Sequence, residues 1–209
     1  YKIFQNLNDN LHVGAYLCDK TNNIMSSKII WLDSVDSTNT EAKRRIDYLP
    51  DMAVIAAYGQ TAGREQRENI WLSAPGLNLT FSIVLKHDGS FLNSLRPENQ
   101  IVISDIMSSA IVSLLSSYGV EARIKLPNDI YVGDKKICGI LIEHAVRGES
   151  MLHSIIGVGM NVNQTVFDDS LPNPTSLALE IGHDRINLQT LLQKLLDLFE
   201  TEIKKSVQD

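Results

Sequence analysis

The feature that most constrains how this chain can fold is a pair of apolar runs on either side of a short polar turn. The runs cover residues 136–146 and 152–160, and residues 147–150 read Arg-Gly-Glu-Ser between them. Two strands joined by so short a connection pair antiparallel, as a hairpin. Apolar alternation, or a short apolar run between turn signals, predicts further strands at residues 53–58, 79–85 and 122–126. The chain therefore contains a sheet built largely from hairpins.

Three segments are predicted to be helices. Residues 98–118 and 188–199 place apolar side chains at three- and four-residue steps. Residues 39–48 follow Thr38 and Glu41, which have the spacing of a capping box. A doubly wound parallel fold needs a regular alternation of strands and helices, whereas these helices stand in separate blocks. We therefore predict an α+β fold with a mixed, mostly antiparallel β-sheet covered by helices on one face.

Composition excludes several classes of protein. The formal net charge of −6, from 19 basic and 25 acidic residues, disfavours a nucleic-acid binder because phosphate contacts require a basic face. No apolar run approaches the roughly 18 to 20 residues that cross a bilayer, so no membrane partner is expected. Cys18 and Cys138 lie far apart and the five histidines form no metal-ligand pair, so no zinc site is predicted. The start of the chain shows no signal-peptide pattern, which favours a cytoplasmic setting.

The polar segment at residues 60–74 has the residue types of a ligand loop. The guanidinium group of Arg64 or of Arg67 can bind two oxygens of a phosphate or carboxylate at once, and Gly63 lets the backbone approach a ligand closely. Trp71 offers a flat surface for a purine. The alternative is a solvated surface loop with Trp71 packed into the core.

The segment around residue 127 is a second candidate. Strand alternation places Arg123 and Lys125 on one face, and Pro127 ends the strand before Asn128. Polar groups at such a bend can contact a ligand, although Pro-Asn-Asp is also an ordinary turn.

Two later strands carry residues that are unusual in an apolar setting. Lys136 enters an apolar strand, where a ligand anion would pair with its ammonium; the alternative is a side chain that reaches solvent from the strand end. Gly157 and Gly159 punctuate the next strand, which often marks the close approach of a ligand or of backbone.

The order and spacing of these motifs are more specific than any one of them. They run Ser37-Thr38-Asn39, Gln60-Thr61-Ala62-Gly63-Arg64, Trp71, Lys125-x-Pro127-Asn128-Asp129, Lys136-x-x-Gly139-Ile140-Leu141 and Gly157-x-Gly159-x-Asn161. In this order they resemble the biotin protein ligase family over residues 31–200, essentially its catalytic domain. The resemblance implies the class II synthetase-like biotin/lipoate ligase fold.

The resemblance also implies an activity and a domain organisation. Members use ATP and Mg²⁺ to adenylate biotin and transfer it to a lysine of a biotin carboxyl carrier protein. Residues 1–30 would form an N-terminal extension of unknown role and residues 31–209 the catalytic domain, with the family's small C-terminal β-barrel absent. Because no helix-turn-helix pattern precedes residue 31, no DNA partner is expected. Members often pair through edge strands, so a homodimer is a further expectation.

The resemblance assigns roles to individual residues. Lys136 and Arg64 would be catalytic, because they offset the repulsion between the biotin carboxylate and the α-phosphate. The biotin-binding set would be Ser37, Thr38, Asn39, Gln60, Gly63, Arg64, Glu65, Gln66, Lys136 and Gly139. The ATP- and adenylate-binding set would be Arg64, Arg67, Trp71, Lys125, Asn128, Lys136 and Asn161. The Mg²⁺ ion would be bound with ATP rather than held by a protein cage.

The loop departs from the family pattern Gly-Arg-Gly-x-x-Gly. Glu65 and Glu68 stand where the second and third glycines fall, Gln66 replaces an arginine, and Leu126 replaces a tryptophan before the proline. A carboxylate near a bound phosphate weakens binding unless a nearby arginine neutralises it. We therefore expect slower adenylation or faster loss of the intermediate, which a chase of preformed biotinyl-adenylate would measure.

Two other functions are compatible with parts of the sequence. Lipoate protein ligases share the expected fold but lack the Gln-x-x-Gly-Arg and Pro-Asn-Asp segments. A non-catalytic remnant that binds biotin or a nucleotide is suggested by Glu65 and Glu68. A purely structural interaction domain explains none of the motif order.

Overall fold

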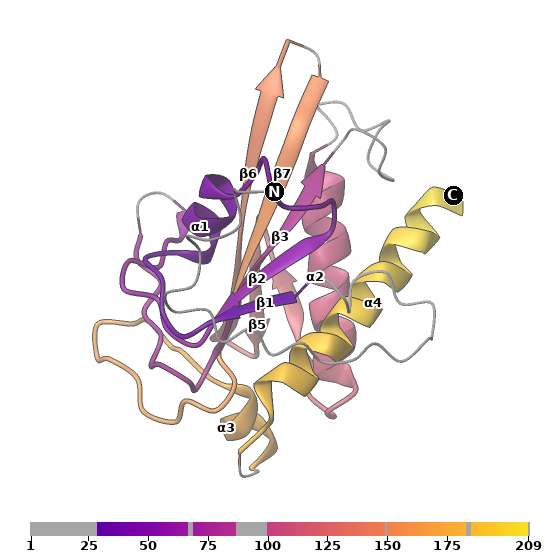
Figure 1. Cartoon of the computed structure of the whole chain (residues 1–209). Helices are drawn as coiled ribbons and strands as arrows, with labels where there is room; N and C mark the ends of the chain where they lie inside the picture. The colour runs from indigo at the N-terminus through magenta and orange to yellow at the C-terminus, as the bar shows by residue number, and fades with distance from the viewer. Residues whose placement is uncertain (1–28, 67–68, 87–99, 149, 183–184, 209) are drawn as a thin grey trace.

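A seven-stranded sheet forms the centre of the molecule (Figure 1). The computed structural model describes residues 29–66, 69–86, 100–148, 150–182 and 185–208. The sheet order is β1-β2-β3-β7-β6-β5-β4; β1 and β2 are parallel and the other neighbours antiparallel. The strands are β1 (Ile29–Leu32), β2 (Ala53–Ala57), β3 (Leu79–Lys86), β4 (Arg123–Lys125), β5 (Asp129–Val132), β6 (Lys135–Arg147) and β7 (Ser150–Met160). The prediction of a mixed, mostly antiparallel sheet is confirmed.

Alternation along the central strands gives the sheet two different faces. Phe81, Val158 and Ile140 lie in register on neighbouring strands and are buried in one hydrophobic cluster. The next row, Ser82, Gly157 and Leu141, points to the opposite face because successive side chains in a strand alternate. One face is thus apolar, and the other carries small and polar side chains in this row and a separate hydrophobic cluster further along.

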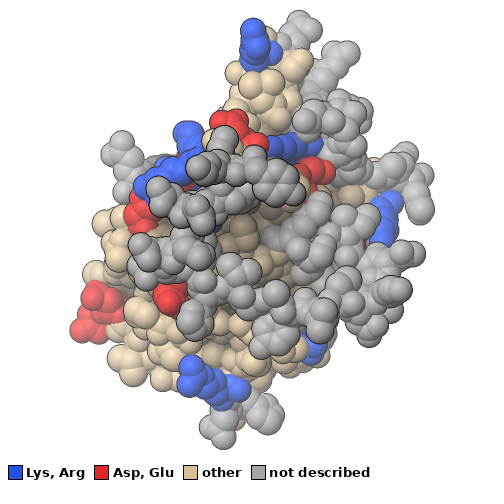
Figure 2. All heavy atoms as spheres, in the orientation of Figure 1, with Lys and Arg blue, Asp and Glu red and all other residues tan. Residues whose placement is uncertain are grey.

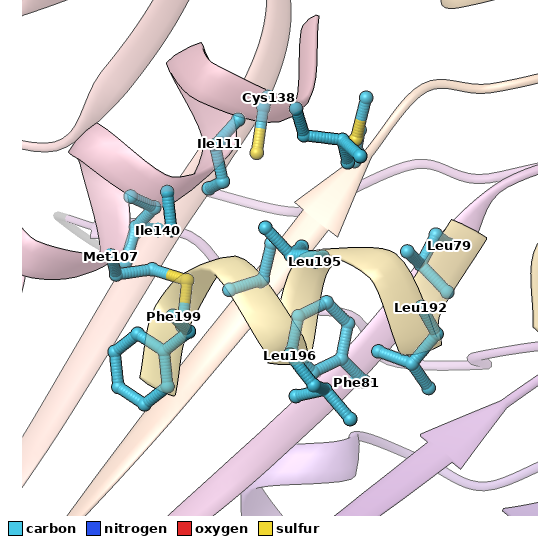
Figure 3. Close-up of a cluster of buried hydrophobic side chains, with 14 of the residues drawn as sticks. Leu79, Phe81, Met107, Ile111, Cys138, Ile140, Leu192, Leu195, Leu196 and Phe199 are labelled. Atoms are coloured by element: carbon cyan, nitrogen blue, oxygen red, sulfur yellow. The ribbon is translucent and has the colours of Figure 1, made fainter. Parts of the chain in front are cut away.

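Two long helices cover the apolar face. α2 (Ile101–Ser116) and α4 (Leu188–Gln208) lie side by side there (Figure 1), and their apolar side chains join those of the sheet in one core. Figure 3 shows part of this core, where Phe199 and Leu195 of α4 meet Phe81 and Ile140 of the sheet. The prediction stopped at Phe199, whereas the helix continues through residues 200–208 and packs Ile203 against the same core.

The opposite face is also partly covered, which corrects the expectation that helices cover one face. α1 (Thr38–Arg44) packs there through Ala42 onto Ile55, Val84 and Ile155. The helix ends four residues before the predicted residue 48, and hydrogen-bonded turns continue to Leu49, which precedes Pro50. Pro50 disfavours helical geometry at Leu49 only, so it does not account for the end of the helix at Arg44.

Three short elements were missed by the sequence analysis. They are β1, β5 and the helix α3 (Leu177–Ile181). β1 begins at Ile29, so the sheet starts inside the segment that was assigned to the N-terminal extension. The predicted start of α2 at residue 98 lies outside the described residues, and within them the helix begins at Ile101. Among the described residues, no helix combines the length and the apolar character that crossing a membrane requires.

Candidate functional site

A cavity of about 360 Å³ lies on the face of the sheet opposite α2 and α4. It brings together eleven of the residues predicted to bind ligand: Ser37, Thr38, Asn39, Gln60, Arg64, Glu65, Gln66, Trp71, Asn128, Lys136 and Gly139. Lys136 and Arg64 come from segments more than seventy positions apart and yet border the same cavity. This shared cavity is the arrangement that the proposed roles require.

Glycines make room for the side chains that cross the floor of the cavity. Gly159 pairs with Gly139, and Gly157 pairs with Leu141, on adjacent strands β7 and β6. A Cβ atom on Gly157 would collide with the amide of Asn39, and one on Gly159 would collide with the ring of Trp71. The predicted close approach is therefore found, and it is made by side chains of the protein itself.

The first turn of α1 places amide and hydroxyl groups at one end of the cavity. The backbone N–H of Thr38 donates to Gln60 Oε1 at 2.8 Å, which ties the helix to the loop after β2. Asn39 Nδ2 donates to the Leu141 carbonyl at 3.2 Å and to Glu143 Oε2 at 2.9 Å. Ser82 Oγ lies 2.6 Å from Asn39 Oδ1. The amide of Asn39 is thus held in one orientation by three partners.

A β-bulge turns Lys136 into the cavity. Tyr131 pairs with Lys136 while Ile130 pairs with Cys138, so Ile137 is the extra residue on β6. Without the bulge, strict alternation would put Lys136 on the same face as buried Cys138. A bulge reverses the side on which the preceding side chain points. Ile137 and Cys138 both enter the core, and Lys136 faces the cavity.

Lys136 is paired with two carboxylates. Its Nζ lies 2.7 Å from Glu65 Oε1 and 3.0 Å from Asp129 Oδ1. Burial lowers the pKa of Lys136, but Glu65 and then Asp129 outweigh it, so that the pKa is raised above its usual value. The ammonium also lies 5.8 Å from the centre of the Trp71 ring. Lys136 therefore carries its charge at neutral pH.

Arg64 is held by Glu143, which comes from the same face of β6 as Gly139. Arg64 Nη2 lies 2.6 Å from Glu143 Oε2, the oxygen that also accepts from Asn39. One carboxylate oxygen thus joins the loop arginine to the helix asparagine. Basic and acidic side chains are interspersed on the face shown in Figure 2, in keeping with such local pairing.

The loop that carries Arg64 is closed on itself. Trp71 N donates to the Gly63 carbonyl at 3.0 Å, and Glu65 N donates to the Asn69 carbonyl at 2.8 Å. A Cβ atom on Gly63 would collide with the backbone of Trp71, so this contact requires glycine. Trp71 is 8% exposed and its buried Nε1 finds no partner among the described residues. Both sequence-based alternatives for Trp71 hold in part, since it is packed against the sheet and also borders the cavity.

Three predicted ligand residues are not brought to the cavity. The Lys125 ammonium lies 4.5 Å from the centre of the Tyr131 ring on the outer strand pair, and the Arg123 guanidinium packs near the same ring. Asn161 is buried and donates from Nδ2 to the Thr175 carbonyl at 2.9 Å, which fixes the segment before α3. Gly63 does not line the cavity and instead contacts the backbone of Trp71 within the loop. Arg67 and Glu68 lie outside the described residues.

Three residues that shape the site were not predicted. Asp129 stood within a quoted motif without an assigned role, and Glu143 and Ser82 stood within predicted strands. A carboxylate and a hydroxyl on strands that are otherwise apolar are the signal that could have identified Glu143 and Ser82. Among the described residues, no group of three His, Cys, Asp or Glu side chains could hold a metal ion.

Together the fold and the cavity define a sheet-based protein with a ligand-sized cavity, lined by amide and hydroxyl groups and by two cationic side chains. The chain belongs to the Biotin/lipoate A/B protein ligase family, whose family model matches residues 31–161. The expected fold is thereby confirmed. A solved biotin protein ligase from Aquifex aeolicus in complex with biotin and ATP has a TM-score of 0.72 at 27% identity, over 85% of this chain and 71% of that one.

Curated relatives agree with the structural likeness. The bifunctional ligase/repressor BirA of Bacillus spizizenii is 29% identical over 181 residues, 85% of this chain and 54% of that protein. The biotin–[acetyl-CoA-carboxylase] ligase of Paracoccus denitrificans is 30% identical over 159 residues, 73% of this chain and 63% of that protein. Lipoate-protein ligase A bound with ATP shares the fold at a TM-score of 0.56 and 14% identity, over 85% of each chain. The chain thus spans about half the length of its BirA relative.

Proposed function

We propose that this chain adenylates biotin with ATP and transfers the biotinyl group to a lysine of a biotin carboxyl carrier protein. The observation that carries the proposal is the shared cavity, which is lined by amide and hydroxyl groups and by the cationic side chains of Lys136 and Arg64. Two named relatives support it: the Paracoccus denitrificans protein is a biotin ligase by name, and the Aquifex aeolicus structure holds biotin and ATP.

The first step joins two anions. A biotin carboxylate oxygen attacks the α-phosphorus of ATP, a carboxyl–phosphate bond forms, and pyrophosphate leaves with the electron pair of the broken bond. Lys136 and Arg64 stabilise the negative charge on the oxygens around phosphorus. Asn39 and Thr38 bind the ureido end, which needs hydrogen-bonding groups rather than charge.

A divalent ion fits this step as a companion of the triphosphate. Mg²⁺ takes few protein ligands when phosphates bind it, and Asp129 is a cavity carboxylate of the required type. When bound, the ion neutralises phosphate charge. Asp129 and the side chains next to it would orient the complex of Mg²⁺ and ATP, and would not hold the ion by themselves.

The second step consumes the mixed anhydride. The carrier lysine, as a free amine, attacks the carbonyl carbon, an amide bond forms and AMP leaves. The closed loop that carries Arg64 shields the anhydride from water until then. The proposed setting is the cytoplasm, which supplies ATP. The proposal includes a homodimer formed through an edge strand of the sheet, and light scattering during gel filtration tests it.

The direct test is incubation with biotin, Mg-ATP and a biotin carboxyl carrier domain, followed by intact-mass measurement of the carrier. We expect a gain of one biotinyl group. Lys136→Ala should lower the rate by about 100-fold or more, because a cation at the reacting atoms is lost. Lys135→Ala is the matched control, since that exposed neighbour lies one residue away. Equal rates for both variants would contradict the role of Lys136.

Two further measurements separate the alternatives. Calorimetry with biotin and with lipoate distinguishes the two ligases, and tighter binding of lipoate would overturn the proposal. Release of pyrophosphate that depends on biotin distinguishes an enzyme from a binding remnant.

A further inference from the structure

Glu65 makes a contact that the proposed function does not explain. This residue stands where the family pattern has glycine. Its Oε1 atom lies 2.7 Å from Lys136 Nζ and makes the shorter of that ammonium's two ion pairs. The same oxygen lies 3.4 Å from the point that a Cβ atom on Gly139 would occupy. The carboxylate therefore sits over the floor of the cavity, in contact with the cation that the acid end of the ligand needs.

The backbone keeps Glu65 in that position. Its N–H donates to the Asn69 carbonyl at 2.8 Å, and Arg64 pairs with Ile70 across the same small loop. Arg64 is anchored in turn to Glu143 at 2.6 Å. Only 23% of the Glu65 side chain is exposed, so that the carboxylate has little water around it. The ion pair with Lys136 is partly buried and held in place by the loop backbone, unlike an ion pair between two exposed side chains.

The charges around Lys136 leave little room for another anion. Two cationic side chains, Lys136 and Arg64, meet three carboxylates, those of Glu65, Asp129 and Glu143. The group has a net charge of −1 before any ligand arrives. Carboxylates that share one cation in a partly buried site repel each other strongly. A ligand carboxylate must therefore displace one of the residents, and Glu65 is the one carried by a loop.

We infer that Glu65 is a specificity-determining residue that acts as an internal counter-ion and selects ligands by the charge of their acid end. The inference rests on the proposed function. In the free protein Glu65 occupies the position of the substrate's anionic group beside Lys136. It weakens binding of the free acid and leaves binding of an uncharged ligand of the same shape nearly unchanged.

Glu65→Gln tests the inference, because the amide keeps the size of the side chain and removes its charge. Calorimetry would measure biotin and biotin methyl ester against wild type and variant. We expect biotin to bind about five- to tenfold more tightly to the variant, since a like charge is lost beside the ligand carboxylate. The affinity for the ester should change by less than about twofold, because the ester carries no charge at that end.

Two further variants complete the design. Glu202→Gln removes the same charge from α4, where Glu202 pairs with Lys205 at 2.7 Å on the opposite side of the sheet, and should change neither affinity. Glu65→Ala removes the contact as well as the charge and should also favour biotin over the ester. Parallel shifts of both ligands, or no shift, would overturn the inference alone. If wild type binds neither ligand, both the inference and the proposed function fail.

Discussion

At the scale of single residues, Glu143 connects two parts of the site. One of its oxygens accepts from Asn39 at 2.9 Å and from Arg64 at 2.6 Å. A carboxylate can serve both donors, because its oxygens offer several acceptor positions and no competing hydrogen. The orientation of the Asn39 amide and the position of Arg64 therefore depend on the same side chain.

Glu143→Gln should uncouple these two parts. The amide can keep the hydrogen bond from Asn39, but it loses the charge that holds Arg64, and hydrogen bonds to charged groups are worth about 1.5–3 kcal/mol. We expect the rate of biotinyl-adenylate release to rise about tenfold or more, while KM for biotin changes less. A chase of preformed adenylate measures the release. Unchanged release would show that Arg64 does not depend on Glu143.

The charge on Lys136 predicts a flat pH response near neutrality. Its pKa is raised above 10.5, since Glu65 and Asp129 outweigh burial. The stabilisation from these pairs is therefore fully present below the unfolded pKa and is lost only as pH rises through the folded pKa. Biotin affinity should stay constant between about pH 7 and 9, as titration calorimetry would record. A decline within that range would identify another group as the anion anchor.

At the scale of elements, the sequence predicted five of the seven described strands and the helices α1, α2 and α4. β3 was predicted from its alternation, β6 and β7 from two apolar runs around a polar turn, and β4 was predicted although it has only three residues. β1 has four residues and α3 has five, and neither was recognised as periodic. β5 was missed because Pro127 and Asn128 indicate a turn, and the strand begins directly after them.

The candidate site was predictable to a similar extent. The motif order identified Lys136, Arg64 and Trp71, which the structure brings to one cavity. The motif order did not indicate the bulge in β6. A bulge is defined by how two strands pair, so it cannot be recognised from the sequence of one strand alone. Glu143 and Ser82 were missed because they act on other side chains, through contacts that depend on tertiary structure.

The packing of α4 on the sheet yields a prediction at this scale. Leu195 is fully buried in the core shared by α2, α4 and the sheet. Leu195→Ala should lower the free energy of unfolding by about 2–5 kcal/mol, because it removes buried methyl groups and leaves a cavity. Leu179→Ala in α3 is the control, since 47% of Leu179 is exposed, and should cost less than about 1 kcal/mol. Denaturant titration measures both variants, and equal losses would contradict this packing.

At the scale of the whole molecule, one face of the sheet carries the main hydrophobic core and the other face carries the cavity. The two long helices bury one face, while α1 and the loop before Trp71 surround a cavity on the other. A ligand that binds only the folded chain stabilises all of it. At a hundredfold excess over Kd the gain is about 2.7 kcal/mol.

Thermal unfolding should report this coupling. For a chain of this length each kcal/mol shifts Tm by about 2–4 °C, so saturating biotin should raise Tm by about 5–10 °C. Lys136→Ala should abolish most of the shift, whereas Lys135→Ala should keep it. A shift that persists in Lys136→Ala would place the acid end of biotin elsewhere.

The alternation along β7 has a consequence for how this protein can evolve. Ile156 and Val158 belong to the core, while Gly157 and Gly159 lie under Asn39 and Trp71. Inserting or deleting a single residue within this stretch would exchange the two sets, driving isoleucine against the amide and opening holes beneath the helices. Descendants of this sequence can therefore vary here by substitution, but length changes have to accumulate at the ends of the strand.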